Sequence, residues 1–321
     1  MDRHRDLATY TWDTVKQDIQ RWKESEPLPP PGGRWLLFLG TGGNPVNLIS
    51  QQSQTGGFLL KTDSLFMHVD PGPGALVHAC RLGIDLGALD AVYVSHAHTD
   101  HSGDAGPVIE AMCRLMSKRK GAVIAPSSVF QEGIISRYHQ GKLPSWGYSG
   151  GPERLIASGG EPEKIGSAEI RFIRAYHGDD NYGFVVQDGD FSIGYTSDTS
   201  YVLAYMSSRG AVEVTPWDSM EDFRGVLRFR EELKHAFSGI DVLVANVSYF
   251  GMFANRCLTA VGLAHMLQGS GIGRCIITHL DACCLRPRDI RAEMAAYVEG
   301  VSGVPTSCAE DNLLLDLGAM D

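Results

Sequence analysis

The feature that most constrains the fold of this chain is a six-residue cluster of three histidines and one aspartate. It reads His96-Ala-His98-Thr-Asp100-His101 and directly follows the apolar run Ala91-Val-Tyr-Val-Ser95, which predicts a buried strand. Unpaired imidazoles and carboxylates are costly to bury, but they are natural ligands of divalent metal ions. At a strand end the first two histidines point the same way and can share one ion, while a turn lets the aspartate and the third histidine reach a second. We interpret the cluster as a metal site rather than as a polar surface turn.

Three later residues of ligand type also lie where an apolar strand opens into a loop. His177 follows the run Ile170 to Ala175, Asp198 follows Gly194-Tyr-Thr-Ser, and His279 closes the run Cys275 to Thr278. Loops at strand ends are common places for binding and catalytic residues. Each residue alone is more often a structural polar group, but together with the cluster they predict a site for two ions.

Strand and helix patterns alternate along the chain, and antiparallel hairpins come early. Strands are expected at 35–39, 57–60, 64–69, 91–95, 122–124, 170–175, 183–187, 191–196, 241–247 and 275–278, and helices at 13–24, 75–81, 107–118 and 259–267. This order predicts an α/β (α+β) sandwich of mixed sheets with helices outside, rather than a purely parallel doubly wound fold.

The first part of the chain is predicted to be an appendage. Asp13 to Glu24 reads as a short helix that ends before Pro27-Leu-Pro-Pro-Pro-Gly-Gly33, a stiff linker. We therefore divide the chain into an N-terminal arm, residues 1–33, and a catalytic domain, residues 34–321. The arm is expected to pack on the body or on a neighbouring subunit.

From about Trp35 onward the chain resembles the metallo-β-lactamase superfamily. The resemblance implies an αββα sandwich, two mixed sheets with helices on the outer faces. It implies one ion held by His96, His98 and His177, another held by Asp100, His101 and His279, and Asp198 bridging the two. Asp70, in His68-Val-Asp70-Pro-Gly-Pro-Gly74, matches the family's first motif and is expected to support the metal loop from behind.

Both ends of the domain are similar to the branch of that family that contains tRNase Z and phosphodiesterases. The opening reads Phe38-Leu-Gly-Thr-Gly-Gly43 and the closing segment Cys308-Ala-Glu-Asp-Asn-Leu-Leu-Leu. The glycine turn is neither a dinucleotide fingerprint nor a P-loop. It is interpreted as a structural turn that brings the backbone near the metals.

The chain departs from the tRNA-processing nucleases at two catalytic positions and in one insertion. Asn246 and Cys257 stand where those enzymes carry a glutamate and a histidine, and His265 nearby is interpreted as a packing or surface residue. About twenty residues separate His177 from Asp198, too few for a tRNA-gripping arm. The formal charge is -10. We therefore expect a small anionic substrate and no extended nucleic-acid surface.

Two segments and three single residues are candidates for the substrate pocket. Residues 129–152 carry Tyr138, His139, Trp146 and Tyr148, and residues 201–236 carry Trp217, Phe223, Arg224, Arg228 and Arg230. They can form a lid with stacking rings and arginines, or a peripheral helical excursion or dimer contact. The single candidates are Tyr182, Asn246 and Tyr249.

We predict a dinuclear metal-dependent hydrolase that cleaves a small phosphodiester, such as a cyclic or short oligonucleotide, by attack of a metal-bound hydroxide. Asp100 and Asp198 are the catalytic candidates, and zinc is the default metal, with manganese as the alternative. A lactone or carboxylic-ester hydrolase with the same site, and a metal-binding regulatory protein without turnover, are the rival hypotheses. The resemblance also allows a homodimer.

The cysteines and the hydropathy indicate the cellular setting. Seven cysteines without a CxxC pair favour reduced thiols over a disulfide framework or a zinc ribbon. The N-terminus lacks an apolar signal region, and no apolar stretch is long enough to span a bilayer. We expect a cytoplasmic protein that does not enter the membrane.

Overall fold

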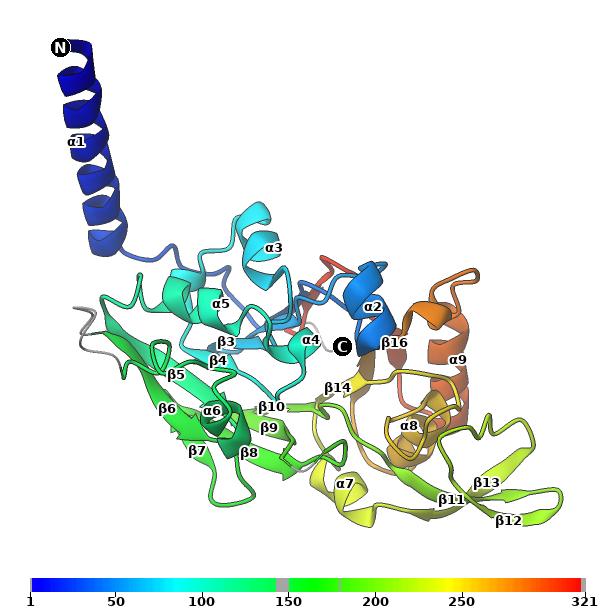
Figure 1. Cartoon of the computed structure of the whole chain (residues 1–321). Coiled ribbons are helices and arrows are strands. Elements are labelled where there is room, and N and C mark those ends of the chain that lie inside the picture. Colours follow the sequence, from blue (N-terminus) through cyan, green and yellow to red (C-terminus); the bar gives the residue numbers. More distant parts are fainter. Residues whose placement is uncertain (1, 143–149, 179, 319–321) are drawn as a thin grey trace.

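Two seven-stranded sheets lie face to face and form the centre of the molecule (Figure 1). The computed structural model describes residues 2–142, 150–178 and 180–318. The first sheet has the order β17 (Leu314–Asp316), β1 (Trp35–Phe38), β2 (Phe58–Lys61), β3 (Phe66–Val69), β4 (Ala91–Tyr93), β5 (Arg119–Ala125) and β6 (Gly151–Ile156). The second has the order β16 (Thr306–Cys308), β15 (Arg274–Thr278), β14 (Val242–Asn246), β10 (Phe191–Tyr195), β9 (Tyr182–Asp188), β8 (Ala168–Arg174) and β7 (Glu163–Ile165).

Both sheets are mixed, as the sequence predicts. In the first sheet, β3 to β6 run parallel, and β17, β1, β2 and β3 are joined antiparallel. In the second, β10, β14, β15 and β16 are parallel, and β7 to β10 form an antiparallel meander. Parallel strands bring their carboxyl ends to one edge, which is where ligands bind in sheets of this kind.

Apolar side chains from the facing surfaces of the sheets form the central core. It contains Phe38, Leu60, Tyr93, Phe184 and Ile193, all almost fully buried. Because successive strand residues point to opposite faces, their neighbours Leu37, Leu59 and Val92 belong to a second core on the outer side. The strands are therefore apolar on both faces, which requires helices outside each sheet.

Helices cover both outer faces and complete the predicted αββα sandwich. On the first sheet these are α3 (Ala75–Arg81), η1 (Leu86–Ala88), α5 (Ala105–Met112) and α6 (Ser127–Gln131). On the second they are α7 (Glu231–Ala236), α8 (Ala260–Leu267), η3 (Ala282–Cys284) and α9 (Arg291–Ser302). Two short helices, α2 (Asn44–Ser50) and α4 (Thr99–Ser102), lie at the edge where the ligands gather. In the part of the chain that the structure describes, no helix has the length and apolar character needed to cross a bilayer.

Residues 201–236 differ from the helical excursion that was one of our two expectations. They form a separate antiparallel sheet in the order β12 (Gly210–Glu213), β11 (Val202–Ser207) and β13 (Phe223–Phe229), followed by α7. A tight turn at 208–209 joins the first two strands, and Tyr205 and Phe223 pack their rings 5.9 Å apart. Cross-strand aromatic pairing of this kind stabilises a small sheet.

Two helix predictions have the wrong bounds. The helix expected at 13–24 is α1 (Asp2–Glu24), 23 residues long, and it projects from the body (Figure 1). The helix expected at 107–118 ends at Met112, since Arg114, Leu115 and Met116 all have φ values between 50° and 57°, and the chain then enters β5. Left-handed backbone cannot continue a right-handed helix.

Candidate metal centre

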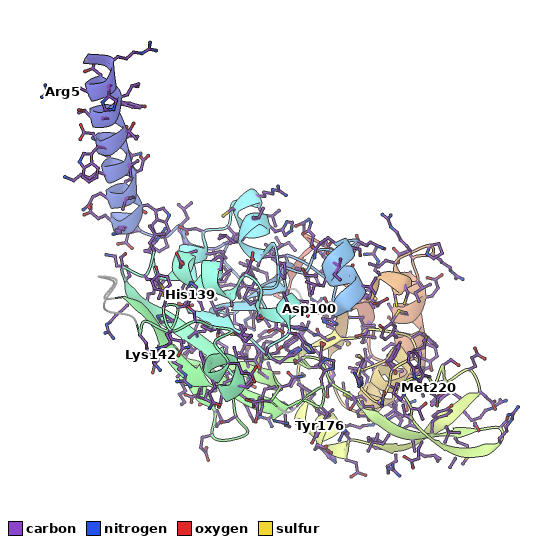
Figure 2. The ribbon with its side chains drawn as sticks, viewed as in Figure 1. Arg5, Asp100, His139, Lys142, Tyr176 and Met220 are labelled. Atoms are coloured by element: carbon purple, nitrogen blue, oxygen red, sulfur yellow. The ribbon has the colours of Figure 1, made fainter. Side chains whose placement is uncertain are left out.

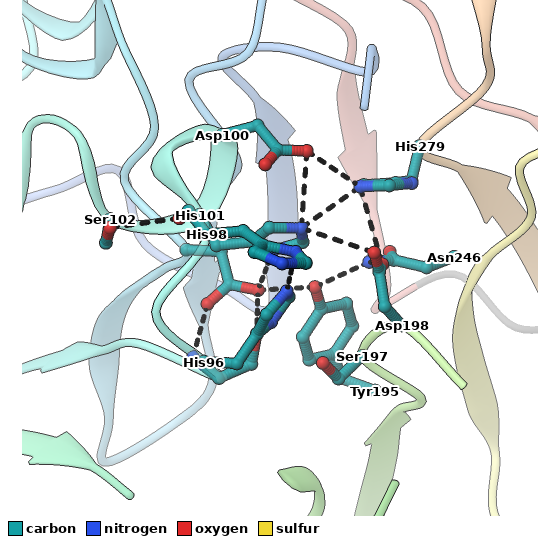
Figure 3. Close-up of polar contacts among 12 residues, drawn as sticks. His96, His98, Asp100, His101, Ser102, Tyr195, Ser197, Asp198, Asn246 and His279 are labelled. Atoms are coloured by element: carbon teal, nitrogen blue, oxygen red, sulfur yellow. Dashed lines mark hydrogen bonds and ion pairs between the residues drawn. The ribbon is translucent and has the colours of Figure 1, made fainter. Parts of the chain in front are cut away.

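The seven predicted ligands come together at one end of the two sheets. Figure 3 labels all of them except His177. The first sheet supplies the 96–101 cluster, which leaves β4 and continues into α4. The second sheet supplies His177 after β8, Asp198 after β10 and His279 directly after β15. The ligands thus come from strand ends that are far apart in sequence, and the sheet topology brings them to one place.

The ligand atoms form three groups, and within each group they lie no more than 4.8 Å apart. The groups are His96, His98 and His177; Asp100, His101 and His279; and His96, His101 and Asp198. In the first group, His96 Nε2 lies 2.9 Å from His98 Nδ1. In the second, His279 Nε2 lies 3.1 Å from His101 Nε2 and 3.3 Å from Asp100 Oδ2. The grouping matches the two ion sites expected from the resemblance.

The Asp198 carboxylate lies between the two groups. Its Oδ2 is 3.6 Å from His177 Nε2 and 3.6 Å from His101 Nε2, and its Oδ1 is 3.4 Å from His279 Nε2. Ligands about 2.0 to 2.1 Å from a tetrahedral zinc ion lie roughly 3.3 Å apart. The spacings around Asp198 are therefore close to ligand-to-ligand edges, and this carboxylate can bridge two ions.

Three of the imidazoles donate a hydrogen bond from Nδ1 to a group behind them, which leaves the lone pair of Nε2 for the metal site. His177 Nδ1 donates to the carbonyl of Arg256 at 2.8 Å, and His101 Nδ1 donates to Asp70 Oδ2 at 2.8 Å. The Ser95 hydroxyl donates its hydrogen to Asp70, so its oxygen accepts from His96 Nδ1 at 3.0 Å. Because Nδ1 carries the proton in each case, Nε2 is free to bind a cation. The donor set fits two divalent ions.

Charges inside the site also suit cation binding. Burial holds the pKa of His96 well below its ordinary value, so this imidazole is neutral at pH 7. For Asp198, burial opposes ionisation, but His279 and His101 outweigh it and lower the pKa of the carboxyl well below its usual range. Burial likewise acts to lower the pKa of His101, yet the surrounding carboxylates, with Asp100 first, raise it. Ions that bind here would displace that proton.

Asp70 supports the cluster from behind, as the resemblance implies. The residue is buried, and its Oδ1 accepts from the Ser95 backbone N–H at 2.6 Å. Its Oδ2 accepts from Ser95 Oγ, His101 Nδ1 and the Tyr195 hydroxyl at 2.7, 2.8 and 2.6 Å. One carboxylate therefore fixes the start of the metal loop and the orientation of one ligand ring.

Asn246 contacts the bridging carboxylate and belongs to the support of the site. Its Nδ2 donates to Asp198 Oδ1 at 2.8 Å and to the Tyr195 hydroxyl at 2.9 Å, and the side chain is 3% exposed. The structure thus places Asn246 beneath the metals, where we had expected a substrate contact. Tyr195 was not predicted, although it is the last residue of β10, three positions before Asp198.

The glycine turn approaches the metal centre, as predicted. Gly42 pairs with Leu280 in an isolated parallel bridge, and a Cβ at Gly43 would lie 2.0 Å from His279 Nε2. The Asp311 carboxylate accepts from the backbone N–H groups of Thr41 and Gln54 at 2.9 and 2.8 Å. The opening and closing motifs noted in the sequence are therefore joined to each other beside the site.

A pocket of about 800 Å³ opens beside the ligands. Three aromatic rings line it, with Phe253 5.7 Å from Trp217 and 5.1 Å from Tyr249. The other lining residues are Leu48, His98, Thr99, Asp100, His177, Asp198, Pro216, Ser248, Arg256, Cys257 and His279. Of the predicted substrate residues, Tyr249 and Trp217 thus reach the pocket. We name Trp217, Tyr249 and Phe253 the aromatic wall.

Other candidates lie elsewhere. Tyr182 packs against the core between the sheets, and its carbonyl accepts from the Tyr93 hydroxyl at 2.6 Å. His139 lies 3.1 Å from Glu110 of α5, on the α5 side of the body (Figure 2). His265 packs 4.6 Å from Phe229 in the manner expected of a packing residue. Trp146 and Tyr148 lie outside the described residues. Arg224 and Arg228 pair with Asp222 and Glu213.

A family model for the beta-lactamase superfamily domain matches residues 67–218. This range includes the 96–101 cluster, His177 and Asp198. An uncharacterized protein of Methanocaldococcus jannaschii is 35% identical to this chain over 173 residues, which make up 52% of this chain and 62% of the relative. The match thus spans less than two thirds of the relative's length.

Solved structures share the fold. YhfI of Bacillus subtilis, a metallo-β-lactamase fold protein, superposes with a TM-score of 0.64 at 17% identity, over 88% of this chain and 98% of that chain. The Zn²⁺-bound PqqB of Methylobacterium extorquens gives 0.61 at 12% identity, over 88% and 100%. The short form of human tRNase Z gives 0.56 at 13% identity, over 88% and 98%. At these identities the likeness establishes the architecture.

Proposed function

We propose that the chain is a dinuclear metal-dependent hydrolase of the metallo-β-lactamase superfamily and that it cleaves a small phosphodiester; the family model over residues 67–218 and the fold shared with YhfI support this assignment. One observation carries the proposal: ligand atoms of seven side chains converge around Asp198 at the floor of a pocket of about 800 Å³. A purely structural metal site is closed by its protein ligands, whereas a catalytic one keeps a position open. Here His98, Asp100, His177, Asp198 and His279 all line the open pocket.

Zinc is the metal we propose, because the donor set is rich in imidazole. The Zn²⁺-bound PqqB structure, which shares the fold, supports this choice. Two such ions would lower the pKa of a bound water and stabilise charge that develops on phosphoryl oxygens. Manganese remains the alternative that metal analysis would distinguish.

The chain's own side chains then have separate tasks. Asp198 spans the two ligand groups and is held in place by Asn246. Asp100 lines the pocket, where its carboxylate can also accept a proton from the attacking water. Cys257 is no rival nucleophile, because burial raises the pKa of its thiol to about 12 and keeps it protonated at pH 7. Hydrolysis by water, without a covalent enzyme intermediate, follows from this arrangement.

A phosphodiester is the favoured substrate because positive charge lies beside the metal ligands. Arg256 lines the pocket next to His177, whose ring nitrogen donates to the Arg256 carbonyl. A guanidinium here would contact the phosphate oxygens that the ions do not neutralise. The structural likeness to tRNase Z, a nuclease of RNA, supports phosphoryl chemistry as well.

The second candidate is a lactone or carboxylic-ester hydrolase. It is favoured by the apolar part of the pocket, where Leu48 and Pro216 adjoin the aromatic wall and would accommodate an acyl chain. Its substrate would not need Arg256. A substrate panel therefore separates the two functions.

The test begins with metal analysis of the purified protein and continues with bis(p-nitrophenyl) phosphate, short oligonucleotides, cyclic nucleotides and lactones. We expect two divalent ions per chain and phosphodiester turnover that a chelator removes. Asp198→Ala should abolish turnover and leave the fold intact, whereas Asp6→Ala, on the exposed helix α1, should change neither. Ester cleavage with no phosphodiester turnover would refute the first candidate in favour of the second.

A further inference from the structure

Metal ligands also line a second groove, and none of the three rings of the aromatic wall is among its described lining residues. This groove, about 540 Å³, is lined by His98, Tyr176, His177, Gly178, Ser200, Arg230, Asn255 and Arg256. It shares His98, His177 and Arg256 with the main pocket. We name it the arginine groove. His98 and His177 thus line both recesses, of which the main pocket carries three aromatic rings and the arginine groove carries two arginines.

The arginine groove is cationic. Two of its lining residues are arginines, and none of its described lining residues is a carboxylate. Among the residues that the structure places, neither Arg230 nor Arg256 has an ion-pair partner of its own, unlike Arg224 and Arg228 on the neighbouring strand. The Glu232 carboxylate lies nearby, but it bonds to the Tyr176 hydroxyl and not to Arg230. Two guanidinium groups without an ion pair of their own beside a metal site favour an anion.

The geometry around Arg230 holds its guanidinium in place. The group lies 3.7 Å from the centroid of the Tyr176 ring, and its Nε donates to Ser200 Oγ at 3.2 Å. The Asn255 Oδ1 atom in the same groove is buried and has no hydrogen-bond partner among the described residues. A positioned guanidinium loses less side-chain entropy when it binds an anion. An unpartnered acceptor in the groove can in addition receive a hydrogen bond from a ligand hydroxyl.

The aromatic wall has the complementary character. Its three rings line the main pocket and not the arginine groove, and Trp217 is 82% exposed, so one face of its ring is available. The rings of Trp217 and Phe253 pack against each other and not against the metal ligands. Exposed aromatic rings in such a position stack with planar bases.

Resting on the proposed function, we infer that the substrate is a linear dinucleotide or short oligonucleotide with a second phosphate next to the scissile one. The scissile phosphorus lies at the ions, the base of one nucleoside stacks on the aromatic wall, and the second phosphate enters the arginine groove. Water adds across one P–O ester bond, so that one product keeps the phosphate and the other leaves with a hydroxyl. A cyclic mononucleotide has one phosphate and one base, and it would leave the arginine groove empty.

The experiment measures equilibrium binding to the metal-loaded protein, so that it does not depend on turnover. The ligands are the phosphorothioate-linked dinucleotides pApA and ApA, which differ by the 5′-phosphate, and 3′,5′-cyclic AMP. We expect the 5′-phosphate to tighten binding at least about tenfold. Arg230→Gln should bring that ratio toward one, and Arg230→Lys should recover part of it. Arg256→Gln should weaken both dinucleotides, because Arg256 also lines the main pocket beside the scissile phosphate.

Two further variants separate the two recesses. Trp217→Ala should weaken pApA and ApA alike by about tenfold, because it removes stacking and leaves the arginines. Arg224→Gln is the matched control, since this arginine pairs with Asp222 outside both recesses. Its pApA to ApA ratio should equal that of the wild type.

Three outcomes would overturn the inference: equal affinity for pApA and ApA, a pApA to ApA ratio that Arg230→Gln leaves unchanged, or cyclic AMP that binds as tightly as pApA. A failure of the proposed function looks different, because it is the absence of any hydrolysis of phosphodiesters, bis(p-nitrophenyl) phosphate included. Hydrolysis without a 5′-phosphate preference would refute the inference alone.

Discussion

The side-chain amide of Asn246 donates a hydrogen bond of 2.8 Å to Oδ1 of Asp198, the carboxylate that lies between the two ligand groups. The same amide nitrogen donates to the hydroxyl of Tyr195, which in turn donates to Asp70. The bridging carboxylate is thus connected through two side chains to the carboxylate that fixes the metal loop.

Replacing Asn246 with Leu keeps the side-chain size and removes both donated bonds. Asp198 then loses the contact that orients it, and we expect metal affinity and activity to fall by about 10- to 100-fold, the usual effect of losing a partner behind a metal ligand. Titration with zinc and steady-state kinetics measure the two effects. Gln268→Leu is the control, because its amide donates to the Val301 carbonyl at the surface. Wild-type affinity in Asn246→Leu would show that Asp198 is oriented by other contacts.

Gly43 cannot be replaced without moving a ligand. A Cβ at this position would lie 2.0 Å from His279 Nε2, so Gly43→Ala must shift the ring or the turn. We expect loss of the ion held by Asp100, His101 and His279, with the other ion retained, and a metal content that falls from about two toward one per chain. Gly300→Ala in α9, where a Cβ meets nothing within 4 Å, should leave metal content unchanged. Two tightly bound ions in the Gly43 variant would contradict the observed approach.

Chelation should destabilise the whole sandwich. The ligands come from both sheets, so bound ions connect the two halves and stabilise only the folded chain. With free metal at about a thousand times its dissociation constant, the stabilisation is about 4 kcal/mol. Thermal unfolding with and without chelator measures it, and Asp198→Ala should show a much smaller difference. Equal unfolding temperatures in the wild type would argue against ions held across the sheets.

Asp188 should make stability depend on pH below about 4. Its buried carboxylate accepts from Thr62 Oγ1 at 2.6 Å, and from the backbone N–H and the hydroxyl of Ser64 at 2.8 and 2.9 Å. Burial opposes ionisation, but these hydrogen bonds outweigh it and lower the pKa of Asp188 in the folded state. The stabilisation is therefore present above the unfolded-state pKa of about 3.9 and is lost as the pH falls through the folded-state pKa.

The variant Asp188→Asn tests this dependence. The metal-free protein is used because loss of bound metal at low pH would itself change the stability. At pH 7 it should lower the free energy of unfolding by about 1.5 to 3 kcal/mol. The difference from wild type should shrink as the pH falls below about 4. Urea denaturation at several pH values measures it, with the exposed Asp6→Asn as the control. A difference that stays constant down to pH 3 would contradict a lowered pKa.

The sequence predicts which side chains come together at the candidate site, because they follow apolar strands whose ends meet at one edge of the sandwich. The support behind them is less visible. Tyr195 reads as an ordinary buried strand residue, and its contact with Asn246 depends on the pairing of β10 with β14. The left-handed backbone at Asp70, Ser197 and His279, with φ values of 50°, 52° and 66°, leaves no mark in composition or periodicity.

The inserted segment shows a second limit of prediction from sequence. Arg224, Arg228 and Arg230 of residues 201–236 were all candidates for binding an anionic substrate. Arg224 and Arg228 instead pair with the nearby carboxylates Asp222 and Glu213. Only Arg230, the residue after β13, lines a recess beside the metal ligands. Whether a charged side chain pairs locally or faces the site depends on the register of its strand. A shift of one residue would turn every side chain of the strand to the other face.

The three-stranded sheet of β11, β12 and β13 contributes none of the seven predicted ligands, yet Trp217 lies between β12 and β13 and Arg230 directly after β13. Part of the proposed substrate recognition is consequently encoded in a stretch of chain that carries none of the predicted ligands. Mutations in residues 201–230 can change substrate preference while the metal ligands stay as they are. In evolution or in protein engineering, this small sheet can therefore be varied or replaced to change substrate specificity without replacing a metal ligand.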